Sequence, residues 1–366
     1  MSTAALLRIP LYDAHRKLNA RMVDFAGWEM PVQYPSGIIA EHLGVRSSCG
    51  LFDLSHMGRV YLRGKDALAL AQRCTTRDLA RIAPGQAAYA LVCREDGGIL
   101  DDVIAYLLGP EEVLFVFNAS NRESDTAWFK QHSGGLDVQV EDQTFQTALI
   151  GVQGPNAQNV LQPLCQADLE PLPGYSFLAA QVGGYAALVS RTGYTGEDGF
   201  EVMVDAEHAE QVWAGLIEKA QPAGLGARDT LRTEAGMALY GHEIDTSTNP
   251  YEARLGWVVN LNKPEFIGRE ALAKLKEQGP SRRLVGLLVE AGGVPRPGFP
   301  ILSEDQRVGT LTSGTYSPSL KRNIALGYAP VDVSHKLAIE MRGKAVPAEV
   351  TRLPFVPHRT RPRATM

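Results

Sequence analysis

The sequence pattern of the chain changes near residue 280, and this change constrains the fold more than any other feature. The stretch 269–278 has helical character and ends at Gly279-Pro280, a pair that terminates helices. Beyond it the chain consists of short β-prone runs separated by Gly and Pro. The runs cover 284–289, 309–312, 324–328, 337–341 and 345–351. They predict an all-β barrel or sandwich of about 85 residues.

The first 280 residues alternate strand-like and helix-like segments, which is typical of a mixed α+β fold. The predicted elements include strands at 60–63 and 113–118, a helix from Asp66 and a helix over 122–132. Two apolar runs within 87–108 are joined by Glu95-Asp96-Gly97-Gly98, and Asp-Gly suits a tight turn. A β-hairpin is therefore expected there. The chain has 366 residues and 45% hydrophobic content, enough for several cores.

Composition argues against several classes of protein. No window approaches ~18 consecutive apolar residues, so a membrane-spanning helix is not expected. The start of the chain lacks a basic segment followed by an apolar run, which argues against a secretory signal. Cys49, Cys74, Cys93 and Cys165 form no Cys-x-x-Cys pair, which favours a reducing compartment over a zinc site or a disulfide framework. We expect a bacterial-type cytoplasm, although a mature mitochondrial chain would have the same features.

Charge is distributed unevenly along the chain. The net charge of -5 argues against a general nucleic-acid binder. From Ser281 onward there are 13 Lys and Arg against 6 Asp and Glu, so this last quarter is basic and the rest is acidic. The basic quarter suggests a docking surface for an acidic partner, since opposite potentials speed encounter. The alternative is a tail that is only solvated.

Several common catalytic motifs are absent from the sequence. There is no Gly-x-Ser-x-Gly elbow and no P-loop, which argues against the hydrolase and NTPase classes. His242-Glu243 is not followed by the second histidine that a His-Glu-x-x-His zinc site needs. The eight histidines show no metal-ligand spacing, so metal catalysis is not expected.

Asp101 and Asp102 begin the outgoing strand of the predicted hairpin, where alternation sends their side chains to opposite faces. A carboxylate entering an apolar strand has a raised pKa unless it is paired or hydrogen-bonded. Such a group suits proton exchange or the stabilisation of a cationic centre. The alternative is that both acids follow the turn and satisfy only backbone amides.

Two further segments combine glycine with charged residues. In the segment 191–201 three glycines would let a ligand approach Glu197 closely, although a tight turn with solvated acids is the alternative. In the segment 226–237, Arg228 and Arg232 share one face of a predicted helix. Their guanidinium groups could clamp a carboxylate-bearing ligand, or they could form salt bridges on a solvated helix.

Together these segments resemble the T-protein of the glycine cleavage system, a family of folate-dependent aminomethyltransferases. The similar segments are 10–12, 22–28, 52–58, 97–102, 153–157, 192–197, 226–232, 266–270 and 312–318. Each segment is short, but their order and spacing along nearly the whole chain are highly specific.

The resemblance implies a fold and a reaction. The fold would have a folate-binding region, 1–278, made of two α+β subdomains around a central cavity, followed by a barrel at 279–366. The subdomains would be roughly 1–50 with 142–278, and 51–141. The reaction would move a one-carbon unit from the aminomethyl-dihydrolipoyl arm of H-protein to tetrahydrofolate, giving methylene-tetrahydrofolate and ammonia. No metal, flavin or nucleotide is implied.

The resemblance also implies roles for individual residues. The catalytic acid of the family falls on Asp102. Glu197 would bind the amino-pyrimidine edge of the pterin, and Arg228 would meet the glutamate tail of folate. The other expected folate contacts are Tyr89, Asn118, Met57 and Trp257, with Trp257 as a plain core residue being the alternative. The tail after Pro357 is basic and lacks the tyrosine that some relatives carry there, so the resemblance does not imply a contact between the tail and the ligand.

Three alternatives are compatible with parts of this pattern. The first is a non-catalytic folate-binding module on the same scaffold, but the joint presence of Asp102, Glu197 and Arg228 favours the enzyme. The second is the folate domain of a sarcosine or dimethylglycine dehydrogenase, which would need an attached flavin domain. The third is a structural protein, which would bind no folate.

Overall fold

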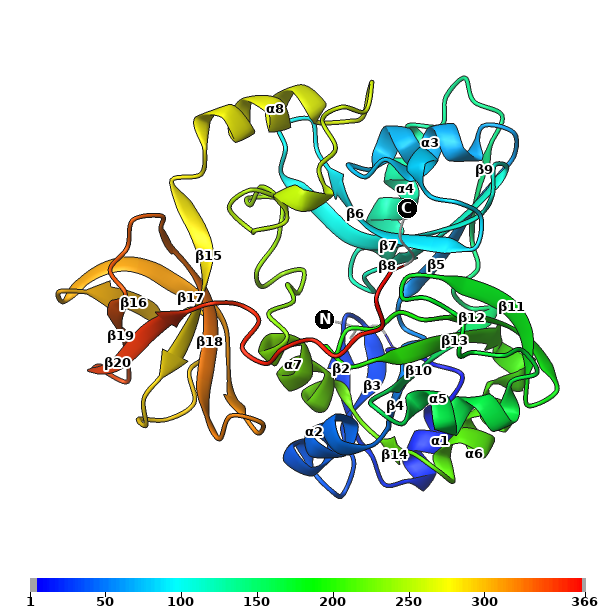
Figure 1. Cartoon of the computed structure of the whole chain (residues 1–366), viewed down its shortest axis with the longest axis horizontal. Helices are drawn as coiled ribbons and strands as arrows, with labels where there is room; N and C mark the ends of the chain where they lie inside the picture. The colour runs from blue at the N-terminus through cyan, green and yellow to red at the C-terminus, as the bar shows by residue number, and fades with distance from the viewer. Residues whose placement is uncertain (1–4, 364–366) are drawn as a thin grey trace.

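The computed structural model of the protein describes residues 5–363, and its strands form four sheets (Figure 1). Residues 1–4, part of the start considered above, lie outside the described residues. A small sheet has the order β1-β3-β2, with β1 (Leu7–Arg8) parallel to β3 (Trp28–Gln33) and β2 (Arg21–Phe25) antiparallel to it. Among the described helices, none has both the length and the apolar character needed to cross a membrane.

A six-stranded sheet with the order β11-β12-β13-β10-β4-β14 carries the first large core. Its strands are β4 (Gly50–Asp53), β10 (Thr147–Gln153), β11 (Phe177–Val182), β12 (Tyr185–Ser190), β13 (Gly199–Asp205) and β14 (Gln221–Pro222). The helices of this part are α1 (Tyr12–Lys17), α2 (Ile38–Ser47), α5 (Ala157–Leu161), η2 (Gln162–Leu164), η3 (Ala206–His208), α6 (Ala209–Ile217) and α7 (Leu225–Glu234). Val152, Phe200 and Trp213 lie in this core, so both sheet and helices contribute to it.

A five-stranded sheet with the order β6-β7-β8-β5-β9 forms the second part. Its strands are β5 (Gly58–Arg63), β6 (Gln86–Cys93), β7 (Ile99–Gly109), β8 (Glu112–Phe117) and β9 (Gln139–Asp142), and its helices are α3 (Ala67–Cys74), η1 (Leu79–Arg81) and α4 (Arg122–Gln131). The predicted hairpin is confirmed, because β6 and β7 pair antiparallel across the Asp96-Gly97 turn. Gly98 packs so closely on the carbonyl of Thr246 that a Cβ there would lie 2.3 Å from it.

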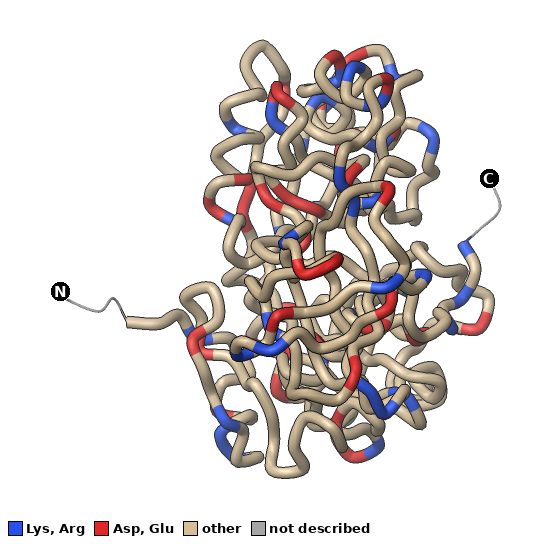
Figure 2. The backbone as a smooth tube through the Cα atoms, turned by 90° about the vertical axis from the view of Figure 1, so that its left-hand side faces the viewer, with Lys and Arg blue, Asp and Glu red and all other residues tan. Residues whose placement is uncertain are grey.

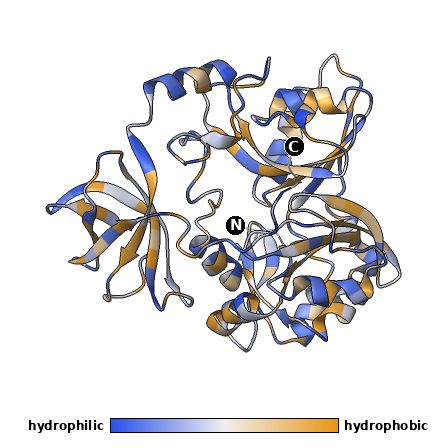
Figure 3. Ribbon diagram, in the orientation of Figure 1, coloured by the Kyte–Doolittle hydropathy of each residue, from blue (hydrophilic) through white to orange (hydrophobic). Residues whose placement is uncertain are grey.

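The C-terminal strands close into a barrel in the order β15-β18-β17-β16-β19-β20. They are β15 (Arg282–Val289), β16 (Pro300–Ser303), β17 (Gln306–Ser317), β18 (Arg322–Pro330), β19 (Lys336–Met341) and β20 (Lys344–Thr351). Hydrophobic and hydrophilic residues are mixed along these strands (Figure 3), as expected when one face lines a core and the other meets solvent. The predicted barrel and the mixed α+β class are therefore confirmed.

The segment between α7 and the barrel links the parts of the molecule. It contains η4 (Gly256–Val258) and α8 (Arg269–Gln278), the latter with the predicted bounds. Ile244, Val258 and Leu272 pack with Leu91 of β6, so this segment, which the subdomain prediction grouped with 142–278, lies against the second sheet. The division of residues 1–278 into subdomains stays a prediction.

After β20 the chain runs back from the barrel along the body of the molecule, as the red segment of Figure 1 shows. The amide of Val356 donates to the carbonyl of Glu234 in α7 (3.0 Å), and the amide of Arg359 donates to the carbonyl of Gly196 (2.8 Å). The amide of Gly174 donates to the carbonyl of Pro362 (2.9 Å). The described tail is therefore packed on the body by backbone hydrogen bonds.

Candidate active site

The acid pair lies at the start of β7, and the two side chains have different surroundings. Asp101 is fully buried and accepts hydrogen bonds from the backbone amide of Asn118 (3.0 Å), from Nδ2 of Asn118 (2.8 Å) and from Nδ2 of Asn121 (2.7 Å). Asp102 is only partly buried. The carboxylate that closes the Asp-Gly-Gly turn is Asp96, whose Oδ1 accepts from the amide of Gly98. The two acids of the pair are therefore not simple turn residues.

Asp102 is held by two side-chain donors. Its Oδ2 accepts from the hydroxyl of Tyr89 on β6 (3.0 Å), and its Oδ1 accepts from Nδ2 of Asn118 (2.8 Å). Desolvation and the neighbouring charge of Asp101 raise the pKa of Asp102 to about 7, against the effect of these hydrogen bonds. A carboxyl group that titrates near neutral pH can serve as an acid or a base and can stabilise a positive charge.

Tyr89 and Trp257 extend this cluster toward solvent. Their rings stack with centroids 5.8 Å apart and an interplanar angle of 20°. Trp257 is 55% exposed, so its alternative assignment as a plain core residue is wrong. A half-exposed aromatic surface next to a carboxylate could accept a flat ring of a ligand. Four of the seven predicted site residues, Asp102, Asn118, Tyr89 and Trp257, thus form one continuous cluster.

Arg228 and Met57 form a second pair near the first cluster. Nη2 of Arg228 lies 3.7 Å from Sδ of Met57, and its guanidinium carbon lies 4.7 Å from the ring centroid of Tyr194. Burial lowers the pKa of Arg228, while the charges of Glu201 and Asp102 act in the opposite direction. Within residues 5–363 Arg228 forms no ion pair. Its charge is therefore free to meet an anionic group of a ligand.

Arg232 does not share this role, although it lies one turn away on α7. It is 1% exposed, and its guanidinium is bound to Glu243 (2.7 Å) and Asp229 (2.7 Å) and donates to the hydroxyl of Ser313 on β17 (2.7 Å). The two-arginine clamp considered from the sequence is therefore wrong. The solvated-helix alternative is wrong for Arg232 as well, because its ion pair with Glu243 is buried.

Glu197 lies in a third cluster and does not contact Asp102 directly. Its Oε1 accepts from Nη1 of Arg46 on α2 (2.7 Å) and from Nη2 of Arg359 in the tail. Its Oε2 is buried and has no hydrogen-bond partner among the described residues. Gly196 adopts φ +76°, which favours glycine, directly before this side chain. The alternative of a turn with solvated acids is wrong, because Glu197 is 2% exposed.

The buried Oε2 of Glu197 also tests whether the site fits a pterin. A buried carboxylate oxygen without a donor is costly unless a donor reaches it. The amino-pyrimidine edge of a pterin offers adjacent N–H donors of the required kind. A folate-type molecule would supply these donors to Glu197, and it would also meet the unpaired charge of Arg228 and the partly exposed Trp257 side chain.

The tail arginines are used within the molecule. Arg359 pairs with Glu197, Arg361 pairs with Glu170 (3.0 Å), and the guanidinium of Arg363 lies 3.8 Å from the ring centroid of Tyr175. Figure 2 shows basic and acidic residues spread along the whole backbone. Residues 357–363 are nevertheless exposed, so the docking surface stays a prediction.

Sequence reasoning missed several residues around the site. Tyr194 lies inside the glycine-rich segment, and its position between Gly193 and Thr195 could have indicated an aromatic contact. Asn121 and Asp125 follow Asn118 with helical spacing, which would have placed them on one face of α4. No local sequence pattern indicated Arg46, because its partners Glu197 and Glu234 are 151 and 188 residues away in the sequence.

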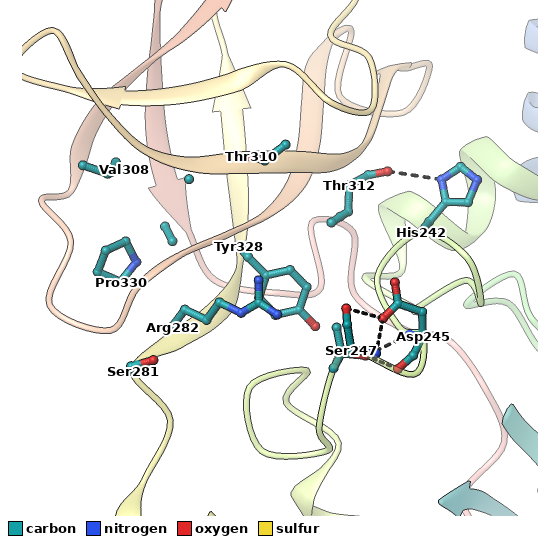
Figure 4. A pocket seen from close by; sticks show the side chains of 13 residues that line it. His242, Asp245, Ser247, Ser281, Arg282, Val308, Thr310, Thr312, Tyr328 and Pro330 are labelled. Carbon is teal, nitrogen blue, oxygen red and sulfur yellow. Dashed lines mark hydrogen bonds between the residues drawn. The ribbon is translucent and has the colours of Figure 1, made fainter. Parts of the chain in front are cut away.

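A separate cavity of about 440 Å³ lies between the barrel and the loop after α7 (Figure 4). His242 closes one side by an Nδ1 contact to the carbonyl of Thr312 (3.1 Å), and Arg282 closes another by pairing with Glu252 (2.8 Å). None of the seven predicted site residues lines it. The candidate active site therefore lies outside this cavity.

Comparisons with known proteins match this chain over nearly its full length. The model of the GCVT N-terminal domain matches residues 11–263, and that of the glycine cleavage T-protein C-terminal barrel domain matches residues 282–357. Proteins named aminomethyltransferase from Rubrobacter xylanophilus and Herpetosiphon aurantiacus are 51% and 48% identical, covering 97% and 94% of this chain and 95% and 97% of their own. The crystal structure of glycine cleavage system aminomethyltransferase T from Bartonella henselae has a TM-score of 0.92 at 35% identity, covering 97% of this chain and 99% of that chain.

Proposed function

The chain belongs to the glycine cleavage T-protein family, and from this premise we propose how its residues carry out aminomethyl transfer. The protein is an aminomethyltransferase of the glycine cleavage system. In the proposed reaction the one-carbon unit moves from the aminomethyl-dihydrolipoyl arm of H-protein to tetrahydrofolate. Ammonia is released, methylene-tetrahydrofolate forms, and the lipoyl arm is left as the reduced dithiol.

The observation that carries the proposal is the state of Asp102. It is a partly exposed carboxyl group with a pKa raised toward neutrality, and Tyr89 and Asn118 fix both of its oxygens. In its ionised form Asp102 would stabilise the positive charge that develops on the one-carbon unit as its bond to sulfur breaks. A carboxylate beside the attacking nitrogen would also accept the proton which that nitrogen loses.

Tetrahydrofolate is the second substrate, and the candidate site supplies groups suited to each part of it. Glu197 would accept from the N–H groups of the pterin, since its Oε2 lacks a donor in the described residues. Arg228 would bind the glutamate tail. Tyr89, Asn118, Met57 and Trp257 would contact the rings between these ends. Trp257 is 55% exposed and would offer aromatic surface beside the Arg363 guanidinium, which lies 5.7 Å from its ring centroid.

We propose that residues 279–366 form one domain and residues 1–278 the folate-binding region. The break of pattern at Gly279-Pro280 and the closed six-stranded barrel support this division. We also propose that the protein works in a bacterial-type cytoplasm, since the compared relatives are bacterial proteins.

The reaction is tested with purified protein, tetrahydrofolate and H-protein carrying an aminomethylated lipoyl arm. Ammonia release and methylene-tetrahydrofolate formation are measured together, and both are expected to depend on all three components. Folate binding without turnover would contradict the proposal and favour the non-catalytic binding module. A protein that neither binds folate nor turns over would contradict both.

Substitution of Arg228 by alanine is expected to weaken tetrahydrofolate binding about 10- to 100-fold, the scale of a charged hydrogen bond lost from a ligand. Calorimetric titration with monoglutamyl tetrahydrofolate measures this effect. Arg16→Ala serves as the matched control, because Arg16 is exposed on α1. Equal affinities for Arg228→Ala and the unaltered protein would show that the glutamate contact is assigned to the wrong residue.

The turnover rate is expected to fall as the pH decreases through the pKa of Asp102, because the ionised carboxylate is the active form. Tyr89→Phe removes a hydrogen bond to that carboxylate, so the acidic limb should move upward by about one pH unit. The pH dependence of kcat/KM measures both effects. Tyr316→Phe is the control, because Tyr316 is partly exposed on the barrel. A limb that stays in place in Tyr89→Phe would contradict the assignment of this titration to Asp102.

A further inference from the structure

A third carboxyl group, Asp125, lies next to the acid pair. It is 2% exposed and belongs to α4, one helical turn after Asn121, whose Nδ2 donates to Asp101. Asn121 is the N-cap residue of α4, and positions four apart share one face of a helix, so Asn121 and Asp125 both approach Asp101 from the start of α4. The Asp125 carboxyl lies next to the Asp101 carboxyl, within reach of a hydrogen bond between them. Two carboxyl groups can share such a bond only when one of them carries a proton.

The surroundings decide which of the two carries it. Burial raises the pKa of Asp101, but the three hydrogen bonds that it accepts from Asn118 and Asn121 act in the opposite direction and stabilise its ionised form. The Oδ2 atom of Asp125 has no donor within residues 5–363. The titratable groups that face Asp125 are Asp101 and Asp102 from β7 and Tyr240 from the loop after α7, and the described part of the chain pairs no basic side chain with it. Burial and the two aspartate charges raise the pKa of Asp125 well above the ordinary range.

We propose that Asp125 is a positioning residue that keeps a proton and donates it in a hydrogen bond to Asp101, and so fixes the Asn118 side chain that orients Asp102. Nδ2 of Asn118 donates to Asp101 (2.8 Å) and to Asp102 (2.8 Å), so the two acids share this one amide group. An ionised Asp101 holds that amide in place. Asp125 acts on Asp102 only through Asp101 and Asn118. The expected effect of Asp125 on turnover rests on the proposed function of Asp102. The location of the proton on Asp125 is independent of that function.

Infrared spectroscopy of protein with isotope-labelled aspartate locates the proton without any substrate. At pH 8 we expect the carbonyl band of a protonated carboxylic acid in the unaltered protein and in Asp102→Asn. The same band should be missing in Asp125→Asn. Absence of the band in the unaltered protein, its loss in Asp102→Asn, or its persistence in Asp125→Asn would each overturn the proposal.

Turnover of two variants then separates a positioning role from a purely structural one. We expect Asp125→Ala to lower kcat by about tenfold. Asp125→Asn keeps a neutral group whose N–H can donate to Asp101, so its kcat should stay close to that of the unaltered protein. Glu123→Gln, a change of acid to amide on the exposed side of α4, is the matched control. Equal kcat values for Asp125→Ala and Asp125→Asn would contradict the proposal. An unaltered protein that shows the infrared band without turnover would contradict the proposed function alone.

Discussion

Replacement of Asp102 by asparagine is expected to lower turnover by at least about 100-fold, because it removes the charge and keeps the shape of the side chain. The hydrogen bonds of Asp102 with Tyr89 and Asn118 fix its orientation, so the amide should occupy the same position. Initial rates of ammonia release and methylene-tetrahydrofolate formation at saturating substrates measure the effect. Turnover close to that of the unaltered protein would remove Asp102 from the mechanism.

The same substitution is expected to stabilise the fold at pH 8, which separates loss of chemistry from loss of structure. The folded pKa of Asp102 is raised, so the folded protein loses stability as the pH rises from about 4, the unfolded value, through the folded pKa. Asparagine removes this cost, and the midpoint of thermal unfolding at pH 8 should rise. Glu95→Gln in the exposed turn of the same hairpin is the matched control for both measurements. A lower midpoint in Asp102→Asn would contradict the raised pKa.

Replacement of Glu234 by glutamine is expected to lower the free energy of unfolding by roughly 3–5 kcal/mol at pH 7, the usual cost of breaking a buried ion pair. Glu234 at the end of α7 is fully buried and pairs with Arg46 (2.9 Å) and His42 (3.2 Å) of α2. It also accepts from the hydroxyls of Ser317, the last residue of β17, and of Ser319 in the turn that follows. One carboxylate therefore joins the body of the molecule to the barrel.

The pH dependence gives this prediction a second test. Burial acts to raise the pKa of Glu234, but the bonds and charge of His42 and the serine hydroxyls lower it to about 2. Its contribution to stability is therefore present above the unfolded pKa and is lost as the pH falls through the folded pKa. Urea denaturation followed by circular dichroism measures the free energy of unfolding. The difference in this free energy between Glu234→Gln and the unaltered protein should be large at pH 7 and smaller near the folded pKa of Glu234. Glu218→Gln, at an exposed position after α6, is the control. A difference independent of pH would contradict the role of the charge.

Part of the candidate site could be predicted from local sequence patterns. The Asp-Gly turn fixed the hairpin, and strand alternation predicted that Asp101 and Asp102 would have different surroundings. The structure agrees, because Asp101 is fully buried and Asp102 is partly exposed. Helical spacing also indicated that Arg228 and Arg232 share a face, but it could not tell that Glu243 and Asp229 occupy Arg232 and leave Arg228 free.

The sequence by itself determined the hairpin, the helix at 269–278 and the change to a barrel near residue 280, and it offered Asp102, Glu197 and Arg228 as candidates for chemistry. These properties depend on periodicity and turn residues, which act over a few neighbouring positions. Only the tertiary structure decided that Arg46 binds both Glu197 and Glu234, that the tail places Arg359 on Glu197, and that Asp125 faces Asp101. These contacts join residues far apart in the chain or on different elements, so they depend on how helices, sheets and barrel pack, and no local pattern encodes that packing.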